Sequence, residues 1–258
     1  MSILKSENYF DLKGKVVLVT GAGNGLGKGY AKIFAESGCL VACAGRNLEA
    51  DQETAREIQS ENGTARGFYV DVTDLPSIER MVAQVLEVYG RIDVLVNNAG
   101  MEVVAPFLEV TPENYDKIAD VNQKGLYFVA QAVARAMMPT GGGKIINIGS
   151  LGSFIGLEES SVYCATKGAV IQLSKTMALE LAKHNIQVNA IAPGYFVTPM
   201  TQPFYDDKTH RSWIESRIPL GRWGTVSDLA GPVIFLASKA SDYITGQTVI
   251  VDGGWLAG

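Results

Sequence analysis

Seven short apolar segments alternate with longer stretches of helical periodicity, and this rhythm most constrains how the chain can fold. The segments are rich in β-branched residues and lie at residues 15–20, 40–44, 67–70, 93–97, 144–148, 187–191 and 248–251. Helical patterns lie between them, at residues 26–37, 49–61, 75–89, 112–138, 160–184 and 226–238. Strands that alternate with helices pair in parallel through right-handed crossovers. The sequence therefore predicts an α/β fold, a Rossmann-type doubly wound parallel sheet of about seven strands.

No linker, repeat or low-complexity tract interrupts this alternation, so we expect a single domain over residues 1–258. One stretch, residues 195–223, departs from the rhythm. It contains Pro199, Pro203 and Pro219, which disfavour long regular helix. Because long irregular loops in compact domains are usually lids or binding segments, we expect a substrate lid at about residues 195–223.

Charge and hydropathy exclude two classes of partner. The 22 basic and 27 acidic residues give a net charge of −5, whereas a nucleic-acid binder usually shows a basic stripe. No apolar run approaches the ~18 residues that a membrane span needs, and residues 1–14 lack the apolar core of a signal peptide. The 3 cysteines lie outside any C-x-x-C spacing and there are only 2 histidines, which argues against a metal site. We expect a cytoplasmic protein without a metal, nucleic-acid or membrane partner.

A glycine-rich turn joins the first expected strand to the first expected helix. It reads Thr20-Gly-Ala-Gly-Asn-Gly-Leu-Gly27. Glycines permit a tight turn and close backbone approach, and the start of the following helix presents free N–H groups to an anion. The spacing does not fit the commoner G-x-G-x-x-G pattern, but its position in the first β-α-β unit favours a phosphate-bearing cofactor.

Three residues form a candidate acid–base site. Tyr163 and Lys167 lie four apart in an expected helix and so share one face. Ser150 follows an expected strand, at the carboxyl edge where open α/β sheets bind ligands. A phenol has a pKa near 10, and a nearby ammonium favours its ionised form. A serine hydroxyl can donate a hydrogen bond to a substrate oxygen as charge develops on it. Taken alone, Tyr-x-x-x-Lys occurs by chance on many helices.

These motifs, in this order, resemble those of the short-chain dehydrogenase/reductase family along the whole chain. The matching pieces are the glycine turn, Asp71, Asn97-Asn-Ala-Gly100, Asn122, Ser150 thirteen residues before Tyr163, Tyr163-Cys-Ala-Thr-Lys167, and Pro193-Gly194 followed by Thr198. The resemblance implies an NAD(P)-dependent oxidoreductase that moves a hydride between nicotinamide and a small alcohol or carbonyl substrate.

The resemblance also implies a role for each matching residue. Tyr163 is the general acid/base, Lys167 binds the nicotinamide ribose and lowers the tyrosine pKa, Ser150 polarises the carbonyl, and Asn122 holds a water that relays protons. The implied cofactor-binding residues are Gly21, Asn24, Gly25, Leu26, Gly27, Asp71, Val72, Asn98, Ala99, Gly100, Tyr163, Lys167, Pro193, Gly194, Val197 and Thr198. A homotetramer is implied too, in which the helices at 112–138 and 160–184, apolar on more than one face, pair across a two-fold axis.

The end of the second expected strand predicts the choice of cofactor. It reads Ala44-Gly45-Arg46-Asn47 and lacks the carboxylate that would accept a hydrogen bond from the adenosine 2′-hydroxyl of NAD. Gly45 leaves room for a 2′-phosphate, and the Arg46 guanidinium suits bidentate phosphate contact. We expect NADP(H) to be preferred, with NAD(H) also accepted.

The substrate is less constrained. Residues 182–195, 217–224 and 240–255 resemble the sugar-acid branch of the family, which includes gluconate 5-dehydrogenase and 2-deoxy-gluconate 3-dehydrogenase. Members of that branch commonly carry arginine where this chain has Met101-Glu102.

Further acidic candidates near the cleft are Glu158 and Glu159, so a carboxylate substrate would need compensation from His210 or Arg211. The predicted substrate is thus a secondary alcohol or ketone, of sugar, sugar-acid or neutral type. The alternative activity is 3-oxoacyl-acyl-carrier-protein reduction, which would predict a basic docking patch near the cleft.

Overall fold

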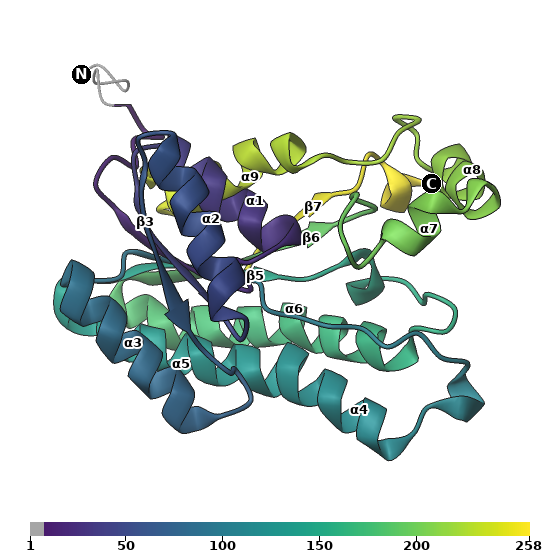
Figure 1. Ribbon diagram of the computed structural model, residues 1–258, viewed down its shortest axis with the longest axis horizontal. Coiled ribbons are helices and arrows are strands. Elements are labelled where there is room, and N and C mark those ends of the chain that lie inside the picture. Colours follow the sequence, from purple (N-terminus) through teal and green to yellow (C-terminus); the bar gives the residue numbers. More distant parts are fainter. Residues whose placement is uncertain (1–7) are drawn as a thin grey trace.

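A parallel sheet of seven strands forms the centre of the computed structural model, which describes residues 8–258 (Figure 1). In sheet order the strands are β3 (Thr64–Tyr69), β2 (Leu40–Gly45), β1 (Val16–Thr20), β4 (Val94–Asn97), β5 (Gly143–Ile148), β6 (Ile186–Pro193) and β7 (Thr248–Val251). Every neighbouring pair is parallel, and the strand order reverses between β1 and β4. The predicted doubly wound α/β sheet is confirmed. The first seven residues of the segment considered above for a signal peptide lie outside the described range.

Helices cover both faces of the sheet. One face packs against α1 (Gly25–Glu36), α2 (Leu48–Ser60) and α9 (Ala230–Ala237). The other packs against α3 (Leu75–Tyr89), α5 (Leu126–Met137) and α6 (Ser161–Leu181) (Figure 1). Alternate residues of β1 point to opposite layers, so both faces of the strand are buried. This explains why the central strands read as continuous apolar runs. Among residues 8–258, no helix combines the length and apolar character needed to cross a membrane.

The helical stretch expected at residues 112–138 is divided in the structure. It consists of α4 (Pro112–Ala119), a π-helical turn (Asp120–Gly125) and α5. The α4 helix begins at a proline in its first turn, capped by the Thr111 side chain, which accepts a hydrogen bond from the Asn114 amide at 3.3 Å. π-Helical turns inside helices are frequent at functional sites, and this one contains Asn122.

Residues 195–223 were expected to be irregular, and this expectation is wrong for half of the segment. The structure forms α7 (Gln202–Asp206) and α8 (Lys208–Arg217) there. The prolines mark helix boundaries rather than preventing helices, because Pro203 lies in the first turn of α7 and Pro219 follows the end of α8. The Asp207 side chain caps α8 by accepting hydrogen bonds from the Thr209 and His210 amides at 2.8 and 3.0 Å.

An aromatic cluster attaches this segment to the rest of the molecule. The ring centroid of Tyr195 lies 5.3 Å from that of Trp223 and 5.0 Å from that of Trp255, near the carboxyl terminus. Tyr205 of α7 packs edge-on against Trp223 at 5.2 Å. Ile214 and Ile218, both buried, join the same cluster. The segment is therefore packed over the carboxyl edge of the sheet rather than extended into solvent.

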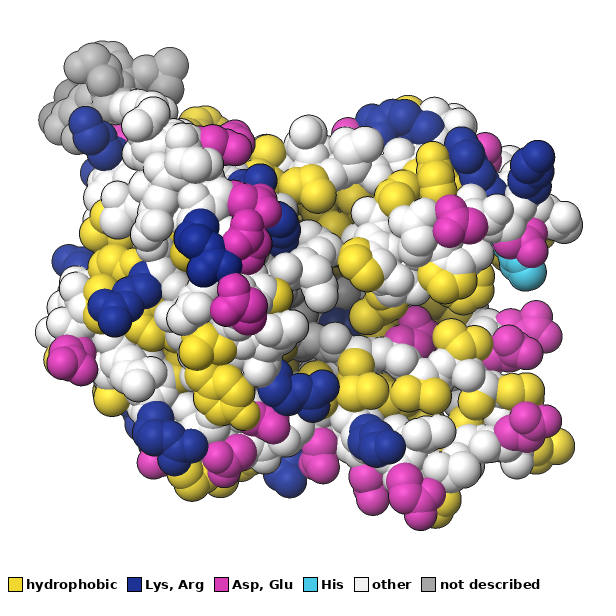
Figure 2. All heavy atoms as spheres, in the orientation of Figure 1, with side chains coloured by type: hydrophobic (Ala, Val, Ile, Leu, Met, Phe, Trp, Pro, Cys, Tyr) yellow, Lys and Arg dark blue, Asp and Glu magenta, His cyan; other side chains and the backbone are white. Residues whose placement is uncertain are grey.

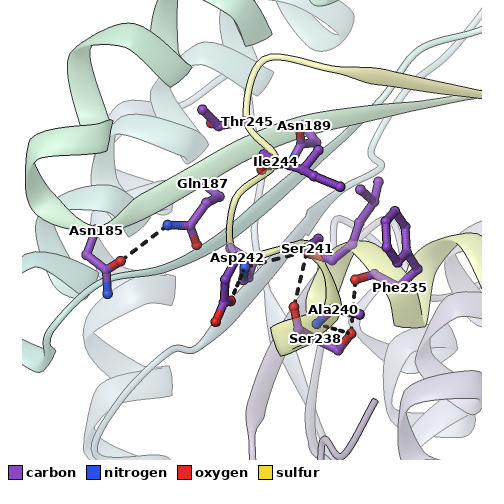
Figure 3. Close-up of polar contacts among 12 residues, drawn as sticks. Asn185, Gln187, Asn189, Phe235, Ser238, Ala240, Ser241, Asp242, Ile244 and Thr245 are labelled. Atoms are coloured by element: carbon purple, nitrogen blue, oxygen red, sulfur yellow. Dashed lines mark hydrogen bonds and ion pairs between the residues drawn. The ribbon is translucent and has the colours of Figure 1, made fainter. Parts of the chain in front are cut away.

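A polar network lies near the amino-terminal ends of the strands, opposite the carboxyl edge of the sheet (Figure 3). At the start of β5, the Lys144 ammonium lies 2.7 Å from the Asp242 carboxylate. The Ser241 hydroxyl donates to the Leu236 carbonyl at 2.9 Å, and the Asn189 amide donates to the Ile244 carbonyl at 2.9 Å. These contacts anchor the residues before β7 to β5 and β6, at the end of the strands remote from the carboxyl edge.

Candidate active site

A cavity of about 350 Å³ lies along the carboxyl edge of the sheet. Figure 2 shows the surface hollowed between α7–α8 and the elements that face them. Of the site residues expected from the sequence, the structure places most in the cavity walls: Gly21, Asn24, Gly25, Leu26, Gly27, Arg46, Asp71, Val72, Asn98, Ala99, Gly100, Ser150, Tyr163, Lys167, Pro193, Gly194 and Thr198. Two do not line it, Asn122 and Val197, and Val197 is 40% exposed.

The glycine turn forms a cradle that a larger residue would fill. Gly25 has a φ of +52°, and a Cβ on Gly27 would lie 2.0 Å from the Gly21 carbonyl oxygen. The Asn24 side chain, at the N-cap of α1, makes no capping hydrogen bond, so the first amides of the helix are left to bind a ligand. A helix start of this kind suits a pyrophosphate, and the cradle therefore fits a dinucleotide cofactor.

The turn after β4 is held against the end of β1. The Thr20 hydroxyl accepts hydrogen bonds from the Asn98 and Ala99 amides, both at 3.0 Å. The Asn98 side-chain nitrogen donates to the Thr20 carbonyl at 3.0 Å. Asn98 thus lines the cavity while its side-chain amide nitrogen is occupied within the protein, where it positions the turn after β4.

Arg46 lies exposed at the end of the cavity nearest β2 and β3. Burial raises the pKa of nearby Asp71, but hydrogen bonds from Thr73 and the charge of Arg46 outweigh burial and hold that pKa below its usual value. Gly45 also lines the cavity, and a Cβ there would lie 2.5 Å from a carboxylate oxygen of Asp51.

Asp51 is a cavity residue that the sequence reasoning missed. The signal that could have found it is its spacing from Ala55 and Ile58, which places it on the buried face of α2.

The three candidate catalytic residues meet beside the ends of β4 and β5. Tyr163 and Lys167 share a face of α6, and the Lys167 ammonium lies 5.6 Å from the centre of the tyrosine ring. Lys167 is only 4% exposed and donates a hydrogen bond to the Ile148 carbonyl at 2.8 Å. Ser150 follows β5, and Ser153 fixes this turn because its hydroxyl accepts from the Ser150 amide at 3.1 Å and donates to the Lys167 carbonyl at 2.7 Å.

The protein environment favours the protonated form of Tyr163. Desolvation raises the pKa of Tyr163 to about 12, a hydrogen bond with Ser150 lowers it, and the charge of Glu102 raises it further. Burial lowers the pKa of Lys167 to about 8, partly opposed by Glu102. Lys167 was expected to lower the tyrosine pKa, but here its ammonium is directed to the Ile148 carbonyl and desolvation of the phenol dominates.

Asn122 supports the cavity wall from behind. It is fully buried, and its side chain pairs with the backbone of Met101, accepting from the amide at 2.8 Å and donating to the carbonyl at 2.8 Å. Its amide nitrogen also lies 3.3 Å from the Thr166 hydroxyl, next to Lys167 in sequence. The side chain of Asn122 is thus engaged by protein groups.

Acidic residues near the substrate end differ in placement. Glu102 is half-buried, one of its carboxylate oxygens has no hydrogen-bond partner among the described residues, and burial raises its pKa. Glu158 and Glu159 are exposed at the surface. The basic residues considered as compensation are occupied within α8, where His210 lies 3.4 Å from Asp207 and Arg211 lies 2.9 Å from Glu215.

Within residues 8–258, no group of three or more histidine, cysteine, aspartate or glutamate side chains is arranged to hold a metal ion.

Comparison with known proteins gives consistent matches over nearly the whole chain. A family model described as "Enoyl-(Acyl carrier protein) reductase" matches residues 21–256. A 2-dehydro-3-deoxy-D-gluconate 5-dehydrogenase from Dickeya dadantii is 43% identical, covering 97% of this chain and 98% of its own length. A sorbitol dehydrogenase from Cereibacter sphaeroides is 43% identical, covering 95% and 99%. A crystal structure of a gluconate 5-dehydrogenase from Burkholderia cenocepacia, in complex with NADP and tartrate, superposes with a TM-score of 0.95 at 40% identity and covers 98% of this chain and 100% of that one.

Proposed function

The chain belongs to the short-chain dehydrogenase/reductase family, and we propose that Tyr163, Ser150 and Lys167 carry out its oxidoreductase chemistry on a secondary alcohol or ketone. One observation carries the proposal. The sheet order places Arg46, the glycine turn, the β4 turn and Ser150 successively along one edge of the sheet, with Tyr163 and Lys167 against the last of these. A dinucleotide laid along that edge would have its phosphates at the turn and its reactive ring at the tyrosine.

The cofactor would be held by the chain's own groups along this edge. The start of α1 and the glycine turn would face the pyrophosphate, and Arg46 would face the adenosine ribose, which supports NADP(H) as the preferred cofactor and NAD(H) as an accepted one. When bound, the nicotinamide supplies the hydride acceptor or donor. Consistent with this preference, the Burkholderia gluconate 5-dehydrogenase was solved with NADP.

The residues at the reacting end handle the proton. Because its pKa is raised, Tyr163 is a phenol at neutral pH and donates its proton to the substrate oxygen during carbonyl reduction. Ser150 donates a hydrogen bond to the same oxygen as negative charge develops there. Alcohol oxidation requires Tyr163 to lose its proton first, because only the phenolate can accept the proton of the alcohol. The buried Lys167 ammonium, on the same face of α6, favours that phenolate.

The charge of Glu102 affects which substrates the site accepts. Its half-buried carboxylate acts on both Tyr163 and Lys167, so a substrate carboxylate brought to the reacting end would meet a like charge. A neutral sugar or polyol would not meet this repulsion. We propose a neutral sugar-type alcohol or ketone as substrate, accepted at least as well as gluconate. A relative named sorbitol dehydrogenase supports this class alongside the sugar-acid relatives.

The proposal also covers the oligomeric state, the cellular location and the domain organisation of the chain. Apolar side chains remain exposed on the helices expected to pair between subunits: Tyr115 (52%) on α4, Tyr127 (40%) on α5 and Leu179 (83%) on α6. We propose a cytoplasmic homotetramer built on these helices. Each subunit is a single domain in which residues 195–223 form the substrate lid, with α7 and α8 held by the aromatic cluster.

A substrate panel tests the proposal. Sorbitol, gluconate, 2-deoxy-gluconate, secondary alcohols, the matching ketones and an acyl thioester are offered with each cofactor, and cofactor absorbance is followed. The expected result is turnover of a polyol or its ketone with NADP(H). Turnover of the thioester alone would favour the alternative, 3-oxoacyl-acyl-carrier-protein reduction.

A further inference from the structure

A buried carboxylate lies at the end of the cavity where Arg46 stands. Asp51, in the first turns of α2, is 1% exposed and lines the cavity together with Gly23, Arg46, Asn47 and Ala50. Its Oδ1 atom has no hydrogen-bond partner among the described residues. Buried polar groups are almost always hydrogen-bonded, so a carboxylate without a protein partner at the wall of a cavity is a candidate for contact with a ligand.

Two glycines leave room for this carboxylate. A Cβ on Gly45, at the end of β2, would lie 2.5 and 3.1 Å from the two Asp51 oxygens. A Cβ on Gly23 would lie 2.8 Å from the Ala50 Cβ, so the glycine turn closely approaches the start of α2. Any larger side chain at position 45 would have to displace the carboxylate. The Asp51 side chain thus occupies the space beside the strand end at which dinucleotide folds bind the adenosine ribose.

No basic group neutralises Asp51 within the described part of the chain. From β2, the facing titratable group is Cys43, a thiol whose pKa is raised to about 12 by burial and then by Asp51, so it stays neutral. On β3, the Arg66 guanidinium lies over the Phe68 ring at 6.0 Å. On α1, Lys28 and Lys32 pair with Glu57 at 2.7 and 2.8 Å.

The remaining charges on and beside α2 are engaged elsewhere. Glu49 and Glu53 pair with Arg56 on the exposed face of the helix, at 2.7 and 2.6 Å. Arg46 acts on Asp71, at the end of β3. With no counter-charge, burial raises the pKa of Asp51 to about 7. The carboxyl group therefore changes charge in the neutral range.

We propose that Asp51 sets the discrimination between NADP(H) and NAD(H), by repelling a 2′-phosphate when ionised and accepting a hydrogen bond from a 2′-hydroxyl in its place. This inference rests on the proposed function, since it takes the cavity to be a dinucleotide site. Arg46 and Asp51 act in opposition: Arg46 favours the phosphate, and ionised Asp51 favours the hydroxyl. Protonation of Asp51 removes the repulsion and leaves Arg46 to dominate.

The preference for NADP(H) over NAD(H) should change with pH, because the charge of Asp51 changes with pH. Below the pKa of Asp51 the acid is neutral, and the preference for NADP(H) is greatest. Above it, binding the phosphate requires uptake of one proton, which weakens relative affinity by up to about tenfold per pH unit. The 2′-phosphate itself ionises near pH ~6, and its extra charge strengthens contact with Arg46 as pH rises. The two trends are opposite, so a fall in NADP(H) preference identifies Asp51.

Direct binding measurements test the proposal without relying on turnover. The Kd values of NADPH and NADH are measured by nucleotide fluorescence from about pH 6 to about pH 8.5, for the full chain and for Asp51→Asn. We expect the ratio of the NADPH Kd to the NADH Kd to rise about tenfold or more in the unaltered protein and to stay flat or fall in Asp51→Asn. Glu49→Gln, on the exposed face of the same helix, is the matched control and should keep the unaltered trend.

A second variant guards against misfolding. Asp51→Leu removes the carboxyl but suits the apolar face of α2, and it should show the same loss of pH dependence as Asp51→Asn. A ratio that rises equally in both variants and the unaltered protein, or that never rises, overturns the role of Asp51. Failure of both nucleotides to bind at any pH overturns the dinucleotide site itself, and with it the proposed function.

Discussion

Replacing Arg46 by leucine should selectively weaken NADPH binding. Arg46 is exposed at the cavity end beside Gly45, and within the described residues its charge acts on Asp71 without a close ion pair. A hydrogen bond to a charged group contributes about 1.5–3 kcal/mol, which corresponds to roughly 10–100-fold in affinity. Solvent exposure weakens such contacts, so the lower end of that range, about tenfold, is expected.

The assay compares Kd for NADPH and NADH by titration at neutral pH. Arg46→Leu should raise the NADPH Kd about tenfold and change the NADH Kd by less than about twofold. Arg80→Leu, on the exposed face of α3, is the control for the general loss of a surface charge. A carboxylate at position 45 is avoided because its Cβ would clash with Asp51. If NADH binds the unaltered protein as tightly as NADPH at low pH, or if the variant loses both equally, Arg46 is not a phosphate ligand.

Two further predictions concern the charge of Glu102 and the oligomeric state. Glu102→Gln removes the like charge near the reacting end, so kcat/KM for gluconate should rise relative to kcat/KM for sorbitol. The expected rise is several-fold, up to roughly 10-fold for about 1.4 kcal/mol of relieved repulsion. An unchanged ratio would place Glu102 outside the substrate site. Light scattering should give a particle of four times the mass of the 27.7 kDa chain. Leu179→Lys places a charge on the exposed apolar face of α6 and should shift the protein toward smaller species. A monomer at micromolar concentration would contradict the proposed tetramer.

The fold was predictable because its central strands are buried on both faces. Val16–Thr20 is a fully buried strand whose apolar run is visible in any reading of the sequence. The start of β3 was missed, since Thr64–Arg66 lies at the sheet edge and alternates exposed with buried side chains. The α8 helix was missed because neighbouring prolines were interpreted as preventing helices rather than bounding them.

The candidate site was predicted from the sequence less completely than the fold. Motif order brought Ser150, Tyr163 and Lys167 together, and the structure places all three in one cavity. What the sequence could not show is the state of each group: that Lys167 points to a backbone carbonyl, or that burial dominates the Tyr163 pKa. Asp51 was not predicted because it lies on the buried face of α2 and not at the end of β2, where dinucleotide folds usually carry their acidic residue.

The proton-donating role of Tyr163 is the central claim, and one comparison tests it most directly. Tyr163→Phe keeps the ring and removes the transferable proton, while Tyr243→Phe alters a fully exposed tyrosine as the control. With the best substrate of the panel, kcat should fall about 10²–10⁴-fold in Tyr163→Phe and stay unchanged in Tyr243→Phe, with the NADPH Kd of both close to that of the unaltered protein. If Tyr163→Phe retains a tenth of the unaltered rate while binding NADPH normally, another group moves the proton and the account fails.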